Sequence, residues 1–458
     1  MSVVAEGIAP KQRFAHLLLT RDVFSWALYD FANTIFSMNI VSSYFKPWLV
    51  DDLGKPGFAF DVTVALSMLA VAILSPALGA LSDRDGSKKR FLFLFTLSCS
   101  LSVAGFSVLP SSFFVVILLL FGLSNFFYEG GMVFYNALLY SVADDDSQAR
   151  YISGFGVALG YLGAILGLFA VLPFVDGDLF GIEIPFVTGS GRSGAFLPTA
   201  VMFFALAVPL FLFVRERVSQ KRKQTKHSVS RAYRELWRNI RDAEQYPGLL
   251  RFLLADFFIK NAVNAVIINI GVFCLYVIGL SDAEKTIFLS IVTFAAVVGS
   301  FVIGRLAVYA SLRKAIILIA IGWIVSMALF GVAVERWQFW LLSALAGILL
   351  GGVWTVHRPY LAEMVPKDEL GKFFGLYSLT GKSAAVVGPL WWGVFFWLFQ
   401  PDGPLWSVFV GTFSVSEAMA QQAPYRVAVA SLALLVGVGL LIFVRGAKPP
   451  ERKVISGE

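Results

Sequence analysis

The chain has 458 residues, of which 58% are hydrophobic and only 15% are charged. Soluble domains carry about 25% charged residues, so this composition excludes an ordinary soluble protein and predicts a polytopic membrane protein. The formal net charge of +7 raises the alternative of a nucleic-acid partner. We set that partner aside because the positive charge gathers beside apolar runs, where basic residues attract anionic lipid headgroups.

Apolar runs of about 20 residues, the length that crosses a hydrocarbon core, recur along the chain. Backbone groups in lipid must pair within their own segment, so each run is expected to form an α-helix. We predict twelve spans: 24–49, 58–82, 91–110, 113–142, 151–174, 195–214, 251–279, 286–309, 314–334, 338–364, 372–399 and 424–444.

The longest polar stretch, 215–250, is rich in Lys and Arg and separates the sixth span from the seventh. It predicts a division into an N-terminal six-helix bundle (1–214), a basic cytoplasmic loop and a C-terminal bundle with a cytoplasmic tail (251–458). Within the loop, apolar residues at helical spacing predict an amphipathic helix at the membrane surface. These residues are Tyr233, Leu236, Trp237 and Ile240.

The distribution of Lys and Arg predicts the orientation, because cytoplasmic loops carry an excess of both. Most of them fall on the side that holds the two ends of the chain, so both termini are expected to be cytoplasmic. About six fall on the opposite side: Lys46, Lys55, Arg192, Lys285, Arg336 and Arg426.

Glycines recur at matching positions 221 residues apart. Gly130-Gly131, Gly154, Gly160 and Gly167 return as Gly351-Gly352, Gly375, Gly381 and Gly388. Parallel repeats of six-helix halves are the architecture of a large class of secondary transporters. The predicted fold is therefore all-α, with 12 transmembrane helices in two parallel-repeat six-helix bundles.

The turn GALSDRDGSKKR (79–90), between the second and third spans, resembles the gating loop of the major facilitator superfamily (MFS). In that superfamily the Asp and Arg of this loop make interdomain contacts that gate alternating access. The resemblance assigns this role to Asp83 and Arg84, although Lys88 and Lys89 also fit a simple role in membrane topology. The full gating-loop prediction is Gly79, Asp83, Arg84, Gly86, Lys88 and Lys89.

A narrower resemblance rests on WALYDFANTIF (26–36), YNALLYSVA (135–143), YISGFGVALGYLG (151–163) and FFGLYSLTGKSAAVVGPL (373–390). These phrases are similar to the bacterial UMF1 family, relatives of the fungal vacuolar effluxer Atg22. The fungal branch exports amino acids from the vacuole. The resemblance thus implies an exporter of a small organic solute, with amino acids as one candidate class.

Ionisable side chains inside spans are the first candidates for chemistry, because a charge at a helix centre costs about 2.5–3.5 kcal/mol on insertion scales. The candidates are Asp30, Glu129, Asp256, Lys260, Arg358 and Lys382. Polar neighbours that could orient a solute are Asn33, Tyr128, Asn136 and Asn264.

We expect Glu129 to be a proton-responsive acid in a central cavity and Lys382 to bind a solute carboxylate. The alternative for Asp30, Asp256, Lys260 and Arg358 is that they form structural pairs or gates. Asp256 and Lys260 are four residues apart and can pair on one helix face.

The remaining signals predict packing and no cofactor. GFGVALG (154–160) has the look of a dinucleotide loop, but no strand precedes it, so its small-x-x-x-small spacings are expected to pack helices. Cys99 and Cys274 lie in apolar runs and form no metal-ligand pattern. We therefore expect neither a metal nor an organic cofactor.

Three classes of function stay in view. The first is a secondary active transporter, with a small-molecule substrate and proton coupling. The second is a membrane enzyme, disfavoured because the three histidines, His16, His227 and His357, lie far apart in the sequence. The third is a non-transporting receptor or lipid scramblase on the same scaffold, which could dispense with Glu129 and Lys382.

Overall fold

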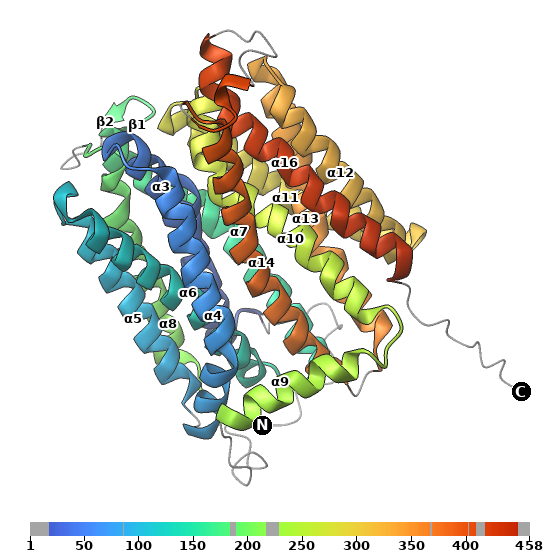
Figure 1. The fold of residues 1–458 in the computed structure, drawn as a ribbon. Helices are drawn as coiled ribbons and strands as arrows, with labels where there is room; N and C mark the ends of the chain where they lie inside the picture. The colour runs from blue at the N-terminus through green and yellow to red at the C-terminus, as the bar shows by residue number, and fades with distance from the viewer. Residues whose placement is uncertain are drawn as a thin grey trace, which may run out of the picture. The chain divides into compact units, whose positions relative to one another are not determined.

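The computed structural model describes residues 18–85, 87–183, 189–216, 229–366, 369–401, 403–408 and 417–447. Almost all of these residues are helical, and the two short strands, β1 (Asp178–Leu179) and β2 (Ile182–Glu183), form one antiparallel hairpin. The prediction of an all-α polytopic membrane fold is confirmed. Figure 1 shows the long helices, coloured along the chain from blue at the N-terminus to red at the C-terminus.

Eleven helical segments in the described part of the chain are long and apolar enough to cross a membrane. They correspond to α4 (Gly57–Asp85), α5 (Lys88–Ser107), α6 (Phe114–Val142), α7 (Asp146–Asp176), α8 (Phe196–Phe213), α10 (Leu249–Phe273), α11 (Asp282–Ala310), α12 (Leu312–Val332), α13 (Arg336–Met364), α14 (Leu370–Phe399) and α16 (Glu417–Gly446). All eleven coincide with predicted spans, with shifted ends.

The first predicted span is helical over residues 21–52 but is not one regular α-helix. It comprises α2 (Arg21–Phe36), a π-helix (Ser37–Tyr44), α3 (Phe45–Pro47) and a second π-helix (Trp48–Asp52). The seventh span has a related ending, because α10 runs into a π-helix at Cys274–Ile278. Such π-helical turns are rare and are frequent at functional sites.

The last span begins earlier than predicted, at Glu417 rather than at 424. Pro424 lies inside this helix instead of starting it. Membrane helices tolerate an internal proline because neighbouring groups satisfy the freed backbone carbonyl.

Contacts divide the chain into two compact units. Unit 1 comprises 1–41 and 77–229, and unit 2 comprises 42–76 and 230–458. In unit 1, α2 packs against α7 and α8, and α5 packs against α6 and α8. In unit 2, α11 packs against α13, and α10 packs against α14 and α16.

The second part of the first span (from residue 42) and the part of α4 before Ala77 therefore belong, by their contacts, to the unit formed by the C-terminal helices. One boundary falls inside the π-helix Ser37–Tyr44 and the other beside Pro76 of α4. A π-turn distorts the regular hydrogen-bond ladder and a proline removes one of its bonds. In both spans the chain thus passes from one unit to the other at a point where the helix is locally weakened.

The predicted amphipathic helix is present as α9 (Val229–Ala243), which runs across the direction of α10 and α14 (Figure 1). The Tyr233 hydroxyl donates to the Ile73 carbonyl at 2.6 Å, and Lys372 Nζ contacts Asp242 Oδ2 at 2.7 Å. Trp237 is 71% exposed. Its ring is therefore free to meet lipid headgroups, although the bilayer position of α9 stays a prediction.

Candidate functional site

Unit 2 buries a cluster of acid and base side chains, the acid–base cluster, formed by Asp256, Lys260, His357 and Tyr377. Asp256 Oδ2 accepts from Lys260 Nζ at 2.8 Å, and Asp256 Oδ1 lies 2.5 Å from His357 Nδ1. Lys260 Nζ lies 3.7 Å from the centre of the Tyr377 ring. Asp256, Lys260 and His357 are each at most 2% exposed.

Three helices bring the acid–base cluster together. Asp256 and Lys260 come from α10, one turn apart, and the predicted pairing between them is present. His357 comes from α13 and Tyr377 from α14. The Phe252 ring packs against both, with ring centres 6.3 and 6.4 Å away.

Two atoms of the cluster are buried without a hydrogen-bond partner among the described residues, His357 Nε2 and the Tyr377 hydroxyl. An unsatisfied buried polar atom typically costs about 1–3 kcal/mol. Native structures keep few such atoms, and each calls for an explanation. His357 is not among the predicted site residues, because in the sequence it is only one of three histidines that lie far apart.

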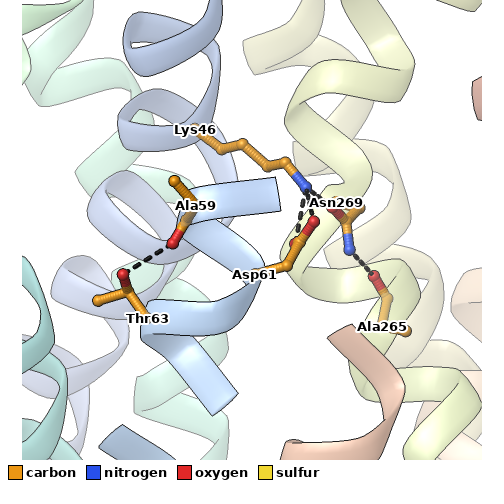
Figure 2. Close-up of polar contacts among 6 residues, drawn as sticks. All are labelled: Lys46, Ala59, Asp61, Thr63, Ala265 and Asn269. Atoms are coloured by element: carbon orange, nitrogen blue, oxygen red, sulfur yellow. Dashed lines mark hydrogen bonds and ion pairs between the residues drawn. The ribbon is translucent and has the colours of Figure 1, made fainter. Parts of the chain in front are cut away.

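A second buried group, the polar lock, joins Lys46, Asp61 and Asn269 (Figure 2). Lys46 Nζ lies 2.7 and 2.8 Å from the two Asp61 carboxylate oxygens and also donates to the Asn269 amide oxygen. Asn269 is held by its own donation to the Ala265 carbonyl at 2.9 Å. All three side chains are at most 5% exposed. The lock ties α3 and α4 to α10 within unit 2.

Further polar contacts surround the lock. Lys285 donates to the Ser43 carbonyl at 3.2 Å and also pairs with Asp282. The Tyr276 hydroxyl donates to Asp51. Gly271 lets the backbones approach closely, since a Cβ there would lie 2.7 Å from the Ser42 carbonyl oxygen.

The polar lock is not among the predicted sites. The sequence predicts Lys46, Lys285 and Arg426 to be charges flanking the membrane on the side opposite the termini, whereas all three are at most 8% exposed. The available signal was a lysine followed by proline inside an apolar run, with an aspartate early in the next run. A single sequence does not reveal that Asn269, 223 residues away, completes the group.

In unit 1 the predicted polar residues around the second half of α2 are partly brought together. Asn33 Nδ2 lies 3.5 Å from the Tyr128 hydroxyl. Asp30 lies against α7, with its carboxylate close to Gly156. Glu129 follows Tyr128 on α6 and is half-buried, whereas Asn136, two turns on, is exposed.

The other predicted residues of unit 2 lie outside the acid–base cluster. Lys382 Nζ is 3.4 Å from the Ser75 hydroxyl. Arg358, beside His357, is exposed, and Asn264 is half-buried. Their roles stay predictions.

The predicted gating loop is described in part. Asp83 and Arg84 lie in the last turn of α4, and Gly79 lies one turn earlier. The Lys88 and Lys89 backbone N–H groups donate to the Glu216 carboxylate, and Lys89 Nζ donates to the Val214 carbonyl at 2.9 Å. Gly86 lies outside the described residues. The gating role of the loop stays a proposal.

Gly156, Gly160, Gly163 and Gly167 of α7 pack against α2, as their spacing predicted, whereas an added Cβ at Gly154 or Gly375 would have no neighbour within 4 Å. A Cβ at Gly163 would lie 2.4 Å from the Phe31 carbonyl oxygen, and one at Gly388 would lie 2.2 Å from the Asn261 carbonyl oxygen. Both glycines therefore let two backbones touch. Within the described residues, no group of three His, Cys, Asp or Glu side chains is arranged to hold a metal ion.

Similar structures define the class of fold. The nucleoside transporter NupG aligns with a TM-score of 0.69 at 11% identity, over 92% of this chain and 99% of its own. A bacterial homolog of the human lysosomal transporter Spinster aligns with a TM-score of 0.66 at 15% identity, over 96% and 97%. At these identities the likeness concerns the fold, which is that of MFS transporters.

Relatives in sequence are consistent with that class. A Bacillus subtilis protein named "Uncharacterized MFS-type transporter YxiO" is 27% identical over 81% of this chain and 87% of its own length. Autophagy-related protein 22 of Kluyveromyces lactis is 23% identical over 81% and 86%. The molecule is thus a multi-pass membrane transporter of MFS type.

The model of the family described as "Vacuole effluxer Atg22 like" matches residues 58–410. The chain belongs to this family. The resemblance seen in the sequence is confirmed.

Proposed function

We propose that the chain is a secondary active transporter that moves a small organic solute by alternating access, driven by a proton gradient. Export across the bacterial cytoplasmic membrane, with both termini cytoplasmic, is part of the proposal. The observation that carries it is the polar lock, which ties α3 and α4 to α10 by an ion pair and an amide.

The physical argument concerns the cost of opening. A buried ion pair adds little stability compared with apolar packing of the same volume, so stability alone does not account for Lys46 and Asp61. When such a contact separates, water hydrates both charges, and this hydration offsets part of the free energy of separating the ion pair. A polar contact is therefore easier to open and close than an apolar one of equal area, as an alternating gate requires.

The solute class follows from the family. Its description names an effluxer, and the resemblance to the fungal branch favours amino acids. A structural neighbour is named as a nucleoside transporter, so nucleosides are the comparison class.

Uptake and counterflow of labelled amino acids and nucleosides in proteoliposomes test the proposal. We expect saturable movement of one class that responds to an imposed proton gradient. If every solute crosses at the rate of protein-free vesicles while a fluorescent lipid equilibrates between leaflets, the protein is a scramblase and the proposal fails.

Glu129→Gln is expected to abolish the response of transport to the proton gradient, because the amide cannot take up a proton, while saturable counterflow persists. The control is Glu244→Gln, an exposed acid on the loop before α10. The measurement is initial transport rate against pH for both variants. An unchanged pH dependence in Glu129→Gln would remove Glu129 as the coupling residue.

A further inference from the structure

The acid–base cluster contains a base that the proposed function does not yet use. The Asp256 carboxylate has both oxygens engaged, one by the Lys260 ammonium and one by His357 Nδ1. An ionised carboxylate only accepts hydrogen bonds, so the imidazole donates from Nδ1. The lone pair of a neutral His357 then lies on Nε2, which is buried and has no partner among the described residues.

We propose that His357 Nε2 is a proton-binding site and that Asp256 is its counter-ion. Its role in driving transport rests on the proposed function; the binding of the proton does not. With neutral His357, the charges of Asp256 and Lys260 cancel. Uptake of one proton makes the cluster singly positive, and histidine is the side chain whose ordinary pKa suits such a change near neutral pH.

After protonation, two cations share one carboxylate. The imidazolium and the Lys260 ammonium both bind Asp256, and the ammonium has an alternative partner in the Tyr377 ring 3.7 Å away. A cation over an aromatic ring is stabilised by about 0.5–2 kcal/mol. Proton uptake therefore weakens the Asp256–Lys260 pair and shifts the ammonium toward Tyr377. Since both residues of the pair are on α10, which also carries Asn269, a change in this pair acts on a helix of the polar lock.

The charged and titratable groups around His357 come from four helices. α10 supplies Asp256 and Lys260, and α14 supplies Tyr377. On α13, Arg358 is exposed and the Tyr360 hydroxyl donates to the Ala447 carbonyl. That carbonyl also accepts from Arg313 of α12. From α16, Phe443 packs on Phe252 and adds no charge. Asp256 is thus the anion in direct contact with the imidazole.

Histidine NMR tests the proposal without a transport assay. The chain has three histidines, so the full-length His16→Gln/His227→Gln variant, labelled with ¹⁵N-histidine in detergent, reports on His357 alone. We expect its ¹⁵N shifts to report the uptake of one proton at Nε2 within the pH range over which the variant stays folded. Asp256→Asn is expected to move its midpoint by about one pH unit or more, the size of effect that an adjacent opposite charge produces.

The matched control is Glu363→Gln, which removes an exposed acid from the same helix as His357 and should leave the midpoint in place. If Asp256→Asn does not fold, Asp256→Asn/Lys260→Gln removes both charges and leaves no unpaired buried lysine. A single protonation state across the whole range, or the same midpoint with and without Asp256, overturns the proposal. Failure of solute transport leaves this result unaffected.

Discussion

Asp61→Asn is expected to open the contact between α3 of the first span and α10. The substitution leaves the Lys46 ammonium buried, at 5% exposure, with amides and the Phe60 ring 5.3 Å away in place of its carboxylate. Removing one member of a buried ion pair typically costs about 3–5 kcal/mol because the other charge is left uncompensated. Opening hydrates Lys46, so the variant should populate a form in which this region meets water.

The measurement is the rate at which a membrane-impermeant maleimide labels Ser43→Cys, after replacement of Cys99 and Cys274. Ser43 is fully buried, and its hydroxyl has no hydrogen-bond partner among the described residues, so a thiol should be tolerated. We expect labelling to accelerate at least about tenfold in Asp61→Asn, the factor that corresponds to 1.4 kcal/mol.

Two controls make this experiment selective. Asp52→Asn changes an exposed acid of the same segment and should leave the rate unchanged. Lys46→Met/Asp61→Leu removes both charges together and should stay closed, because apolar side chains can replace a buried ion pair without loss. Equal labelling of Asp61→Asn and the parent protein would show that the pair does not hold the contact shut.

Gly163→Ala is expected to destabilise unit 1, whereas Gly154→Ala is not. A Cβ at Gly163 would lie 2.4 Å from the Phe31 carbonyl oxygen, so α2 and α7 must move apart. Overpacking of this kind costs about 1–3 kcal/mol. Gly154 is on the same helix and has nothing within 4 Å of the added carbon.

Thermal unfolding in detergent separates the two variants. Gly163→Ala should lower the midpoint, and Gly154→Ala should keep or raise it, since alanine is favoured over glycine in a helix by about 0.5–1 kcal/mol. If both variants unfold at the same temperature as the parent, the close packing of α2 on α7 does not contribute to stability.

The fold could be predicted from the sequence because lipid leaves a spanning segment few choices. An apolar run of sufficient length must be helical, and the glycine repeat indicated two related halves. The hydrophobic pattern did not predict the irregular path of residues 37–52. Contacts distant in sequence reach this segment, such as the one from Lys285 to the Ser43 carbonyl, and the pattern of a single run does not encode them.

The sites were predictable only where the interaction is local. Asp256 and Lys260 pair across one helical turn, so their spacing revealed them. His357 joins the same carboxylate from 101 residues away, and Asn269 joins Lys46 from 223 residues away. Nothing in the spacing of a single sequence encodes such partners. Lys46 therefore looked like a flanking charge, although it is buried against Asp61.

The central claim is that solute movement alternates with opening of the polar lock. Its most direct test is maleimide labelling of Ser43→Cys, with Lys46 and Asp61 intact, in proteoliposomes during turnover. We predict that a transported solute together with a proton gradient changes the labelling rate, and that a solute that is not transported leaves it constant. Transport at the full rate with unchanged labelling at position 43 would contradict the claim.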